Sequence, residues 1–186
     1  MFLINDFIAL LASNLILIQA LGISTIFIAA QNKKNLIGTA SVITVFTTVG
    51  SMAAFGINKL LGEKYTDFTL IFYTLAVGII YILLLGAFWL IGRESFEKTR
   101  KYVHISAFNC AVMGTLFTIG GRADAVSFTD YLYLGFEAGI GFIIAAIILT
   151  AAYRKLNSSK VPQSFRGFPA MLVYLGIISM AVYSLK

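Results

Sequence analysis

Six long runs of apolar residues, separated by short polar segments, dominate the pattern of the chain. They lie at about residues 7–30, 36–61, 68–91, 102–119, 128–153 and 169–185. Each is close to the ~20 residues that a helix needs to cross a bilayer. Isolated strands would leave backbone groups unpaired in lipid, so helices are expected. The pattern predicts an all-α integral membrane protein with six transmembrane helices in a single domain, residues 1–186.

The first and fourth runs are less uniformly apolar than the others, with Asn14 in the first and Asn109 in the fourth. They open two three-span halves, near 1–96 and 97–186. Because three is an odd number, the second half enters the membrane from the opposite side, as in inverted-topology repeats. In such repeats, interrupted helices at equivalent positions mark the site. A plain six-helix bundle explains the hydropathy equally well.

Composition also separates the chain from soluble domains. It is 59% hydrophobic and 12% charged, with a mean hydropathy of +0.90, whereas soluble domains are nearer 25% charged. The net charge of +6 sits in short segments between apolar runs, which favours lipid headgroups over nucleic acid as the partner. The single cysteine excludes a disulfide within the chain and any Cys-pair metal site built from this chain alone.

Basic residues are divided unequally between the two sides of the predicted topology. Ten follow spans one, three and five: Lys33, Lys34, Arg93, Lys98, Arg100, Lys101, Arg154, Lys155, Lys160 and Arg166. Four lie on the side of the termini: Lys59, Lys64, Arg122 and Lys186. The positive-inside rule therefore predicts a multi-pass protein of the cell (inner) membrane with both termini outside.

The fourth span holds the only histidine and the only cysteine, His104 and Cys110, with Asn109 beside the cysteine. Polar groups are costly in hydrocarbon and tend to face a partner, a cavity or a site. The alternative is that Cys110 is a small buried residue packed between helices, which is the commoner role of a free cysteine.

The fifth span combines small residues with a carboxylate. Gly135 and Gly139 are one helical turn apart, a spacing that favours close contact with another helix. Glu137 lies at about 200° from Gly135 around the helix, on the face of Gly141. It is the only acidic residue well inside a span, which indicates proton or cation handling. A carboxylate that lines a wet crevice or pairs with another subunit is an equally good explanation.

Four motifs spread over the chain resemble those of one family. The sequence N-C-A-V-M-G at 109–114 is similar to a family motif N-C-A-V-L-G, and G-F-E-A-G-I-G-F at 135–142 to a glycine-rich fifth span. The segment at 161–169 is similar to V-P-x-x-F-R-G-x-P, and the segment from 14 to 23 to the beginning of N-x-V-L-V-x-x-L-G-L-C-P. The chain thus resembles the A-type membrane subunits of the Rnf/Nqr family of ion-translocating electron-transport complexes.

The resemblance implies six helices in two inverted halves, with the first and fourth helices interrupted. It also implies pairing with a homologous six-span subunit of opposite topology. Each of the two family members contributes two cysteines to a 2Fe-2S cluster midway across the membrane. Electrons pass this cluster between a cytoplasmic module and flavin-bearing subunits on the far side, and their flow is coupled to movement of Na⁺ or H⁺.

The chain departs from the family pattern where the cluster would be held. Cys110 matches the fourth-span cysteine, but Ser24 stands in place of the first-span cysteine and Thr25 in place of the proline after it. Clusters are held mainly by thiolates, so Ser24 is the weaker candidate ligand. His104 replaces a family proline and lies nearly opposite Cys110 on an ideal helix. Glu137 replaces a small residue.

Three functions remain open. The first is a redox subunit in which Cys110 and Ser24 hold the cluster. The second is a scaffold or ion-pathway subunit that has lost the cluster. The third is a stand-alone secondary transporter with a site between the first and fourth spans. The transporter's site is expected to be lined by Asn14, Gln19, Ser24, Asn109 and Glu137, and the candidate residues of an ion pathway are Asn14, Asn109 and Glu137. An isolated gene favours the third; neighbouring genes for a second six-span homologue and redox subunits favour the others. No nucleotide-binding loop or catalytic triad spacing occurs, so catalysis by the chain alone is not expected.

Overall fold

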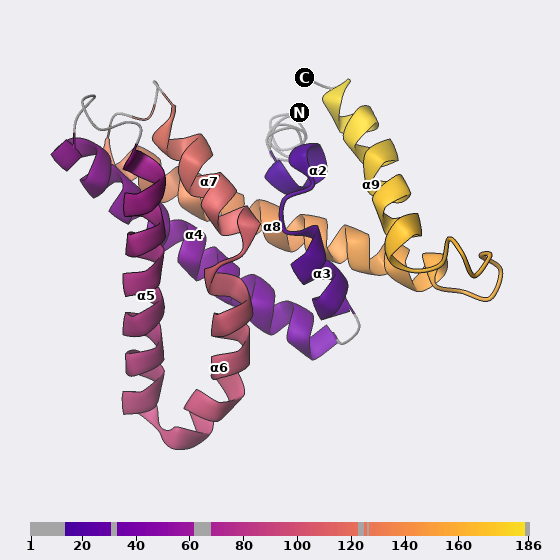
Figure 1. The fold of residues 1–186 in the computed structure, drawn as a ribbon, viewed down its shortest axis with the longest axis horizontal. Coiled ribbons are helices and arrows are strands. Elements are labelled where there is room, and N and C mark those ends of the chain that lie inside the picture. The colour runs from indigo at the N-terminus through magenta and orange to yellow at the C-terminus, as the bar shows by residue number, and fades with distance from the viewer. Residues whose placement is uncertain (1–13, 31–32, 62–67, 123–124, 126, 185–186) are drawn as a thin grey trace, which may run out of the picture.

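The computed structural model of the chain describes residues 14–30, 33–61, 68–122, 125 and 127–184. The elements that these residues form are all α-helices, which confirms the predicted all-α class. In chain order (Figure 1) they are α2 (Leu15–Gln19), α3 (Ile23–Ala30), α4 (Lys33–Leu61), α5 (Thr69–Ile91), α6 (Arg93–Ala107), α7 (Cys110–Gly120), α8 (Phe128–Leu156) and α9 (Phe168–Tyr183).

Three of these helices are long and apolar enough to cross a membrane: Leu36–Leu61 within α4, Thr69–Leu90 within α5, and α8. They confirm the second, third and fifth predicted spans. The pair α6 and α7 forms a fourth candidate, bent by 52°. Helix α9 has 16 residues, or ~24 Å, which is less than the ~30 Å of a hydrocarbon core. Six spans in two inverted halves therefore stay a prediction.

Both helices that the resemblance implies to be interrupted are interrupted. The fourth predicted span breaks between α6 and α7, after Ala107. The first breaks between α2 and α3, where Ala20 has a φ of +58° and Gly22 a φ of +82°. Glycine adopts this left-handed region without penalty, whereas a residue with a Cβ pays about 1–2 kcal/mol. The part of this span at 7–13 lies outside the described residues.

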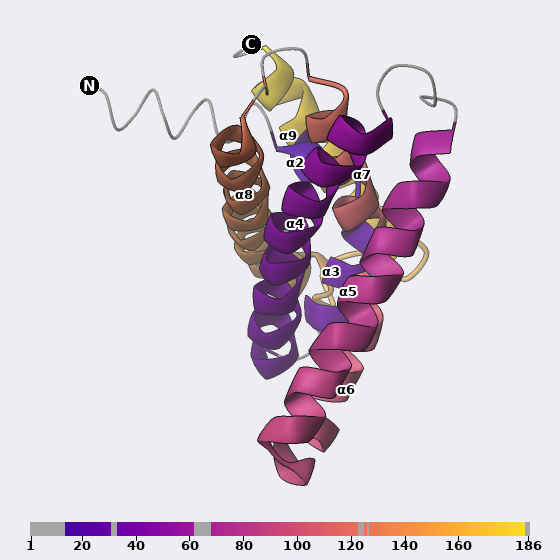
Figure 2. The ribbon, with the colours of Figure 1, turned by 90° about the vertical axis from the view of Figure 1, so that its left-hand side faces the viewer.

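The charged segment between the third and fourth predicted spans is helical, although the hydropathy pattern assigned it to a connecting loop. Helix α6 begins at Arg93, and the Lys98 ammonium donates to the Glu94 carboxylate one turn away, at 2.5 Å. A polar helix has no apolar run to mark its start, so hydropathy places that start too late. Helices α5 and α6 form a hairpin that extends beyond the other helices (Figures 1 and 2).

Helices α4 and α8 make the most extensive contact between the described helices and lie side by side in Figure 2. A Cβ on Gly139 would lie only 2.8 Å from the Cα of Thr44 on α4. Gly135 lies one turn before Gly139 on α8, and Ser51 of α4 lies beside it. The Ser51 hydroxyl donates to the Tyr131 carbonyl of α8 at 2.8 Å. The predicted small-residue face of the fifth span is confirmed, and its partner is α4.

Residues next to the helix starts determine where the fifth and sixth predicted spans begin. Ser127 and Asp130 form a capping box at α8, in which the Ser127 backbone N–H donates to the Asp130 carboxylate at 2.8 Å. At α9, Gly167 takes a φ of +86° and Pro169 is the second helical residue. Both residues favour a helix start at this position, because glycine tolerates a positive φ and proline suits a first turn.

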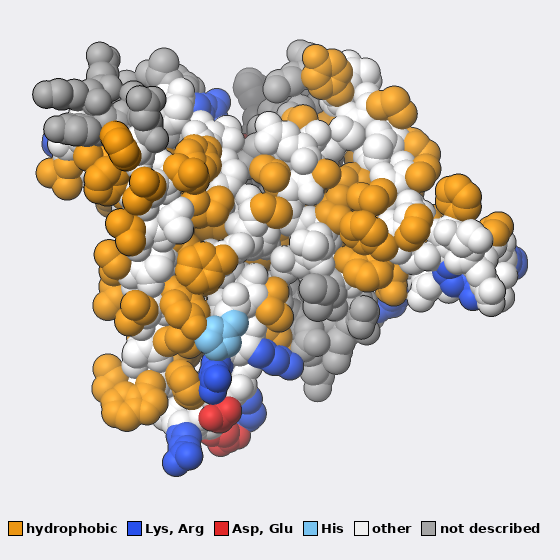
Figure 3. Space-filling view, viewed as in Figure 1, with side chains coloured by type: hydrophobic (Ala, Val, Ile, Leu, Met, Phe, Trp, Pro, Cys, Tyr) orange, Lys and Arg blue, Asp and Glu red, His pale blue; other side chains and the backbone are white. Residues whose placement is uncertain are grey.

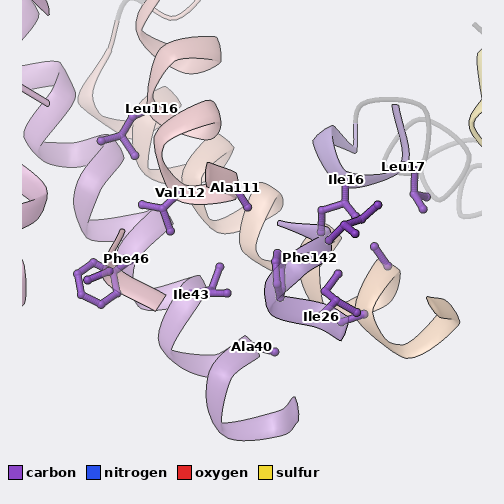
Figure 4. Close-up of a cluster of buried hydrophobic side chains, with 14 of the residues drawn as sticks. Ile16, Leu17, Ile26, Ala40, Ile43, Phe46, Ala111, Val112, Leu116 and Phe142 are labelled. Atoms are coloured by element: carbon purple, nitrogen blue, oxygen red, sulfur yellow. The ribbon is translucent and has the colours of Figure 1, made fainter. Parts of the chain in front are cut away.

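Apolar side chains from each of the described helices form a common buried cluster. Figure 4 shows part of it, with Ile26 of α3, Ile43 of α4, Val112 of α7 and Phe142 of α8. Helix α5 contributes little to it and leaves most of its apolar surface exposed. Figure 3 shows this apolar surface along α5, with charged side chains at the tip of the hairpin. Such a surface is expected of a chain surrounded by lipid or other subunits.

Candidate functional site

The breaks in the first and fourth predicted spans contact each other. The Gly22 backbone N–H donates to the Cys110 Sγ across an N···S distance of 3.0 Å. A Cβ on Gly22 would lie 2.9 Å from the Ala111 Cβ and 3.3 Å from the Asn109 Oδ1. The start of α3 can approach the start of α7 this closely because residue 22 is a glycine. We call this contact the junction: Gly22, Asn109, Cys110 and Ala111.

Asn14 and Asn109, both candidates from the sequence, cap helices. The Asn14 Oδ1 accepts from the Ile16 backbone N–H at 3.0 Å, and the Asn109 Oδ1 accepts from the Ala111 backbone N–H at 3.0 Å. The Asn14 Nδ2 then donates to the Gly141 carbonyl on α8 at 2.6 Å. The Asn109 Nδ2 is buried and has no hydrogen-bond partner among the described residues.

The Cys110 thiol is exposed on the chain's surface, so its interpretation as a buried packing residue is wrong. The reason is its position around α7. The buried residues of this helix are Ala111, Val112, Thr115, Leu116 and Ile119. They make one stripe at the helical period, and Cys110 lies off that stripe. Ser24 is also exposed, in the first turn of α3 and two residues after Gly22.

His104 is engaged by neighbours on the hairpin and not by Cys110. The Arg100 Nε donates to the His104 Nε2 at 3.1 Å, and the Tyr81 hydroxyl lies 2.6 Å from the His104 Nδ1. Because arginine can only donate, Nε2 is the acceptor, and a neutral ring then carries its proton on Nδ1. Both ring nitrogens have partners, which removes the histidine from the set of free metal ligands.

A cavity of about 70 Å³ lies between α2, α4, α7 and α8. Its polar lining consists of Asn14, Thr47, Thr115, Thr118, Arg122 and Glu137. Ala111 and Phe142, the neighbours of Gly22, also line it, so the junction and the cavity share a wall. Of the three predicted ion-pathway residues, the cavity brings together Asn14 and Glu137 but does not include Asn109. Gly141 joins Glu137 in the lining, as their shared helix face predicts.

Sequence reasoning missed the cavity's threonines, Thr47, Thr115 and Thr118. Each hydroxyl donates to a carbonyl of its own helix, at distances of 3.0, 2.8 and 2.8 Å. Threonine is common in apolar helices for this reason, and such a residue gives no signal of a site. The spacing of Thr115 and Thr118 places them on neighbouring positions of α7, but only the fold shows that this face meets Glu137.

The comparison with known proteins covers nearly the whole chain. Residues 4–186 match the family described as "Rnf-Nqr subunit, membrane protein". The chain belongs to the Rnf-Nqr family. This Rnf-Nqr chain is 25% identical over 175 residues to the A-type subunit of the ion-translocating oxidoreductase complex of Shewanella amazonensis, covering 92% of this chain and 89% of the relative. It is 23% identical over 178 residues to the corresponding A-type protein of Syntrophotalea carbinolica, covering 93% and 90%.

This Rnf-Nqr chain lacks the two cysteine ligands that the resemblance implies it should give to an iron–sulfur cluster. Cys110 is its only thiol. Within the described part of the chain, no group of three or more His, Cys, Asp or Glu side chains is placed to hold a metal ion. Ser24 offers a hydroxyl instead of a thiol, and His104 has other partners. The residues present therefore do not fit a cluster to which this chain gives two thiolates.

Proposed function

We propose that the chain is a membrane subunit of an ion-translocating oxidoreductase complex, in which electron transfer across the membrane is coupled to transport of Na⁺ or H⁺. The proposal is carried by the junction, where two interrupted helices meet at Cys110. The relatives support it, because proteins named as A subunits of ion-translocating oxidoreductase complexes match more than 90% of this chain. Interrupted helices that meet inside a membrane protein are the usual setting of an ion or substrate site.

The proposal includes a topology. Six spans form two inverted halves, near 1–96 and 97–186, with both termini outside the cell membrane and a homologous six-span protein of opposite topology as partner. The paired breaks and the unequal division of basic residues support this arrangement. The exposed position of Cys110 supports a partner, because a thiol at the surface of the chain is available to a neighbouring protein of the complex.

A second candidate is a scaffold or ion-pathway subunit that has lost the cluster. The observation that favours it is the single thiol, since Ser24 stands where the resemblance expects a second cysteine. The two candidates share the fold and the partners. They differ in whether Cys110 ligates iron together with thiolates from the partner.

The test is to purify the complex through a tag on this chain and to measure iron, flavin and the EPR spectrum of the reduced sample. Flavin- or iron–sulfur-bearing subunits are expected to co-purify, and a chain that purifies alone contradicts the proposal. A two-iron signal that disappears in Cys110→Ser supports the cluster. Iron fully accounted for by the other subunits supports the second candidate.

Restoring the missing thiol makes the test sharper. In the redox interpretation, Ser24→Cys raises the iron content per complex, because a thiolate binds iron more strongly than a serine hydroxyl. The matched control is Ser41→Cys, an exposed serine of α4 that is not part of the junction. Equal iron in both variants and in the unmodified complex removes Ser24 from the candidate ligands.

A further inference from the structure

The Glu137 carboxylate has no partner within the part of the chain that the structure describes. It is half-buried and lines the cavity between α2, α4, α7 and α8. Neither a hydrogen bond nor an ion pair joins it to another described residue. By the helix rise, it lies about 14 Å from the first residue of α8, inside an apolar span. A carboxylate without a partner at this depth is costly and indicates a bound ligand.

Apart from Arg122, the polar side chains that line the cavity offer acceptors more than donors. The hydroxyl protons of Thr47, Thr115 and Thr118 are all committed to carbonyls of their own helices. One N–H of the Asn14 amide is likewise committed, because its Nδ2 donates to the Gly141 carbonyl at 2.6 Å. Oxygen lone pairs and a carboxylate remain, and these are the ligands that hard cations prefer.

Charge and size narrow the choice of cation. Among the described residues of the lining, Glu137 is the only acidic one, and Arg122, which has an interaction of its own, adds a positive charge two residues beyond α7. Divalent cations in proteins are usually held by more than one carboxylate or by a full shell of oxygens. The volume of about 70 Å³ leaves room for a small ion with roughly two to four waters, at ~15 Å³ or more for each water.

We propose that Glu137 and the cavity's threonine oxygens bind a monovalent cation, Na⁺, inside this chain. The inference rests on the proposed function, because it assigns an ion-binding site to the proposed ion-translocating subunit. The cavity shares Ala111 with the junction, and Phe142, a neighbour of Gly22, also lines it, so the ion lies beside the place where the two interrupted helices meet.

The experiment is equilibrium binding of ²²Na⁺ to the complex purified through this chain, in a buffer with no other alkali cation. The complex is expected to bind one more Na⁺ per copy of this chain than the Glu137→Gln complex. The matched control is Glu97→Gln, which removes an exposed carboxylate of α6 outside the cavity and leaves the stoichiometry unchanged. Equal Na⁺ stoichiometry in native and Glu137→Gln complexes overturns the proposal.

A second variant tests the site even if Glu137→Gln does not fold. Thr115→Val keeps the shape of a buried side chain and removes one oxygen from the cavity. It is expected to raise the Kd of Na⁺ about three- to tenfold at unchanged stoichiometry; an unchanged Kd overturns the proposal. If no redox subunit co-purifies, the proposed function fails, while Na⁺ binding by the full chain in detergent still tests this site independently.

Discussion

At the scale of single residues, side chains of the junction pair with backbone groups that the helix breaks leave without partners. Each break in a helix frees N–H and C=O groups that lipid cannot satisfy. The Asn109 side chain accepts from the Ala111 N–H, and the Cys110 sulfur accepts from the Gly22 N–H. Cys110 therefore has a structural role as an acceptor, whether or not it also binds iron.

Gly22→Ala is expected to destabilise the chain. The new Cβ would meet Ala111 and Phe142 at 2.9 and 3.1 Å, and the residue would hold a φ of +82°. Left-handed strain and overpacking together amount to about 2–4 kcal/mol. The measurement is the thermal unfolding midpoint in detergent, with Gly78→Ala as control because no atom lies within 4 Å of a Cβ at that position. Equal midpoints for the two variants would contradict the close approach at the junction.

At the scale of the helices, α4 and α8 hold the walls of the cavity together. Gly135 and Gly139 allow the two backbones to approach, while Glu137, between them in sequence, turns toward the cavity. Lipid provides no hydrophobic force between helices, so close packing of small residues carries their association. The same helix thus uses one face for packing and another for chemistry.

Gly139→Val is expected to separate α4 from α8, because its Cβ would meet the Cα of Thr44 at 2.8 Å and cannot be accommodated by a side-chain rotation. The expected loss is about 1–3 kcal/mol from overpacking. The measurement is the unfolding midpoint, and the control is Gly176→Val, because Gly176 lies in α9 with open space around it. Both variants carry the same cost of a β-branched residue in a helix, so their difference reports the overpacking alone. A similar loss in both variants would argue against the α4–α8 contact.

At the scale of the whole molecule, the described helices leave two features uncovered. One is the apolar surface of α5, where Leu75, Ile79 and Ile82 are each more than half exposed. The other is the Cys110 thiol at the bend between α6 and α7. Both suit a chain that functions with lipid and other subunits around it, as the proposed complex requires.

Cys110 reports directly on whether a partner covers the junction. Since it is the only cysteine, labelling by a small maleimide is specific to this position. The thiol is expected to be protected in the intact complex and to react at least tenfold faster after the subunits are separated in detergent. The measurement is the labelled fraction by mass spectrometry over time. Equal rates in both samples would place the partner interface elsewhere.

Several features of this protein follow from the sequence alone, because they depend on near neighbours in the chain. The apolar runs determine α4, α5 and α8, and Ser127 with Asp130 determines where α8 begins. The spacing of Gly135 and Gly139 indicates a packing face on the basis of helical periodicity. Local polarity likewise singles out Asn14, Cys110 and Glu137 as unusual residues for a membrane span.

The tertiary structure alone decides which of these residues meet and which are exposed. Gly22 and Cys110 are 88 positions apart, and Asn14 and Gly141 are 127 apart. No local pattern encodes such contacts, because they depend on the angles at which two broken helices cross and pack. The same packing exposes Cys110 and brings Arg100 into a hydrogen bond with His104. It also places Glu137 in a cavity with threonines, which the sequence does not distinguish from ordinary helix residues.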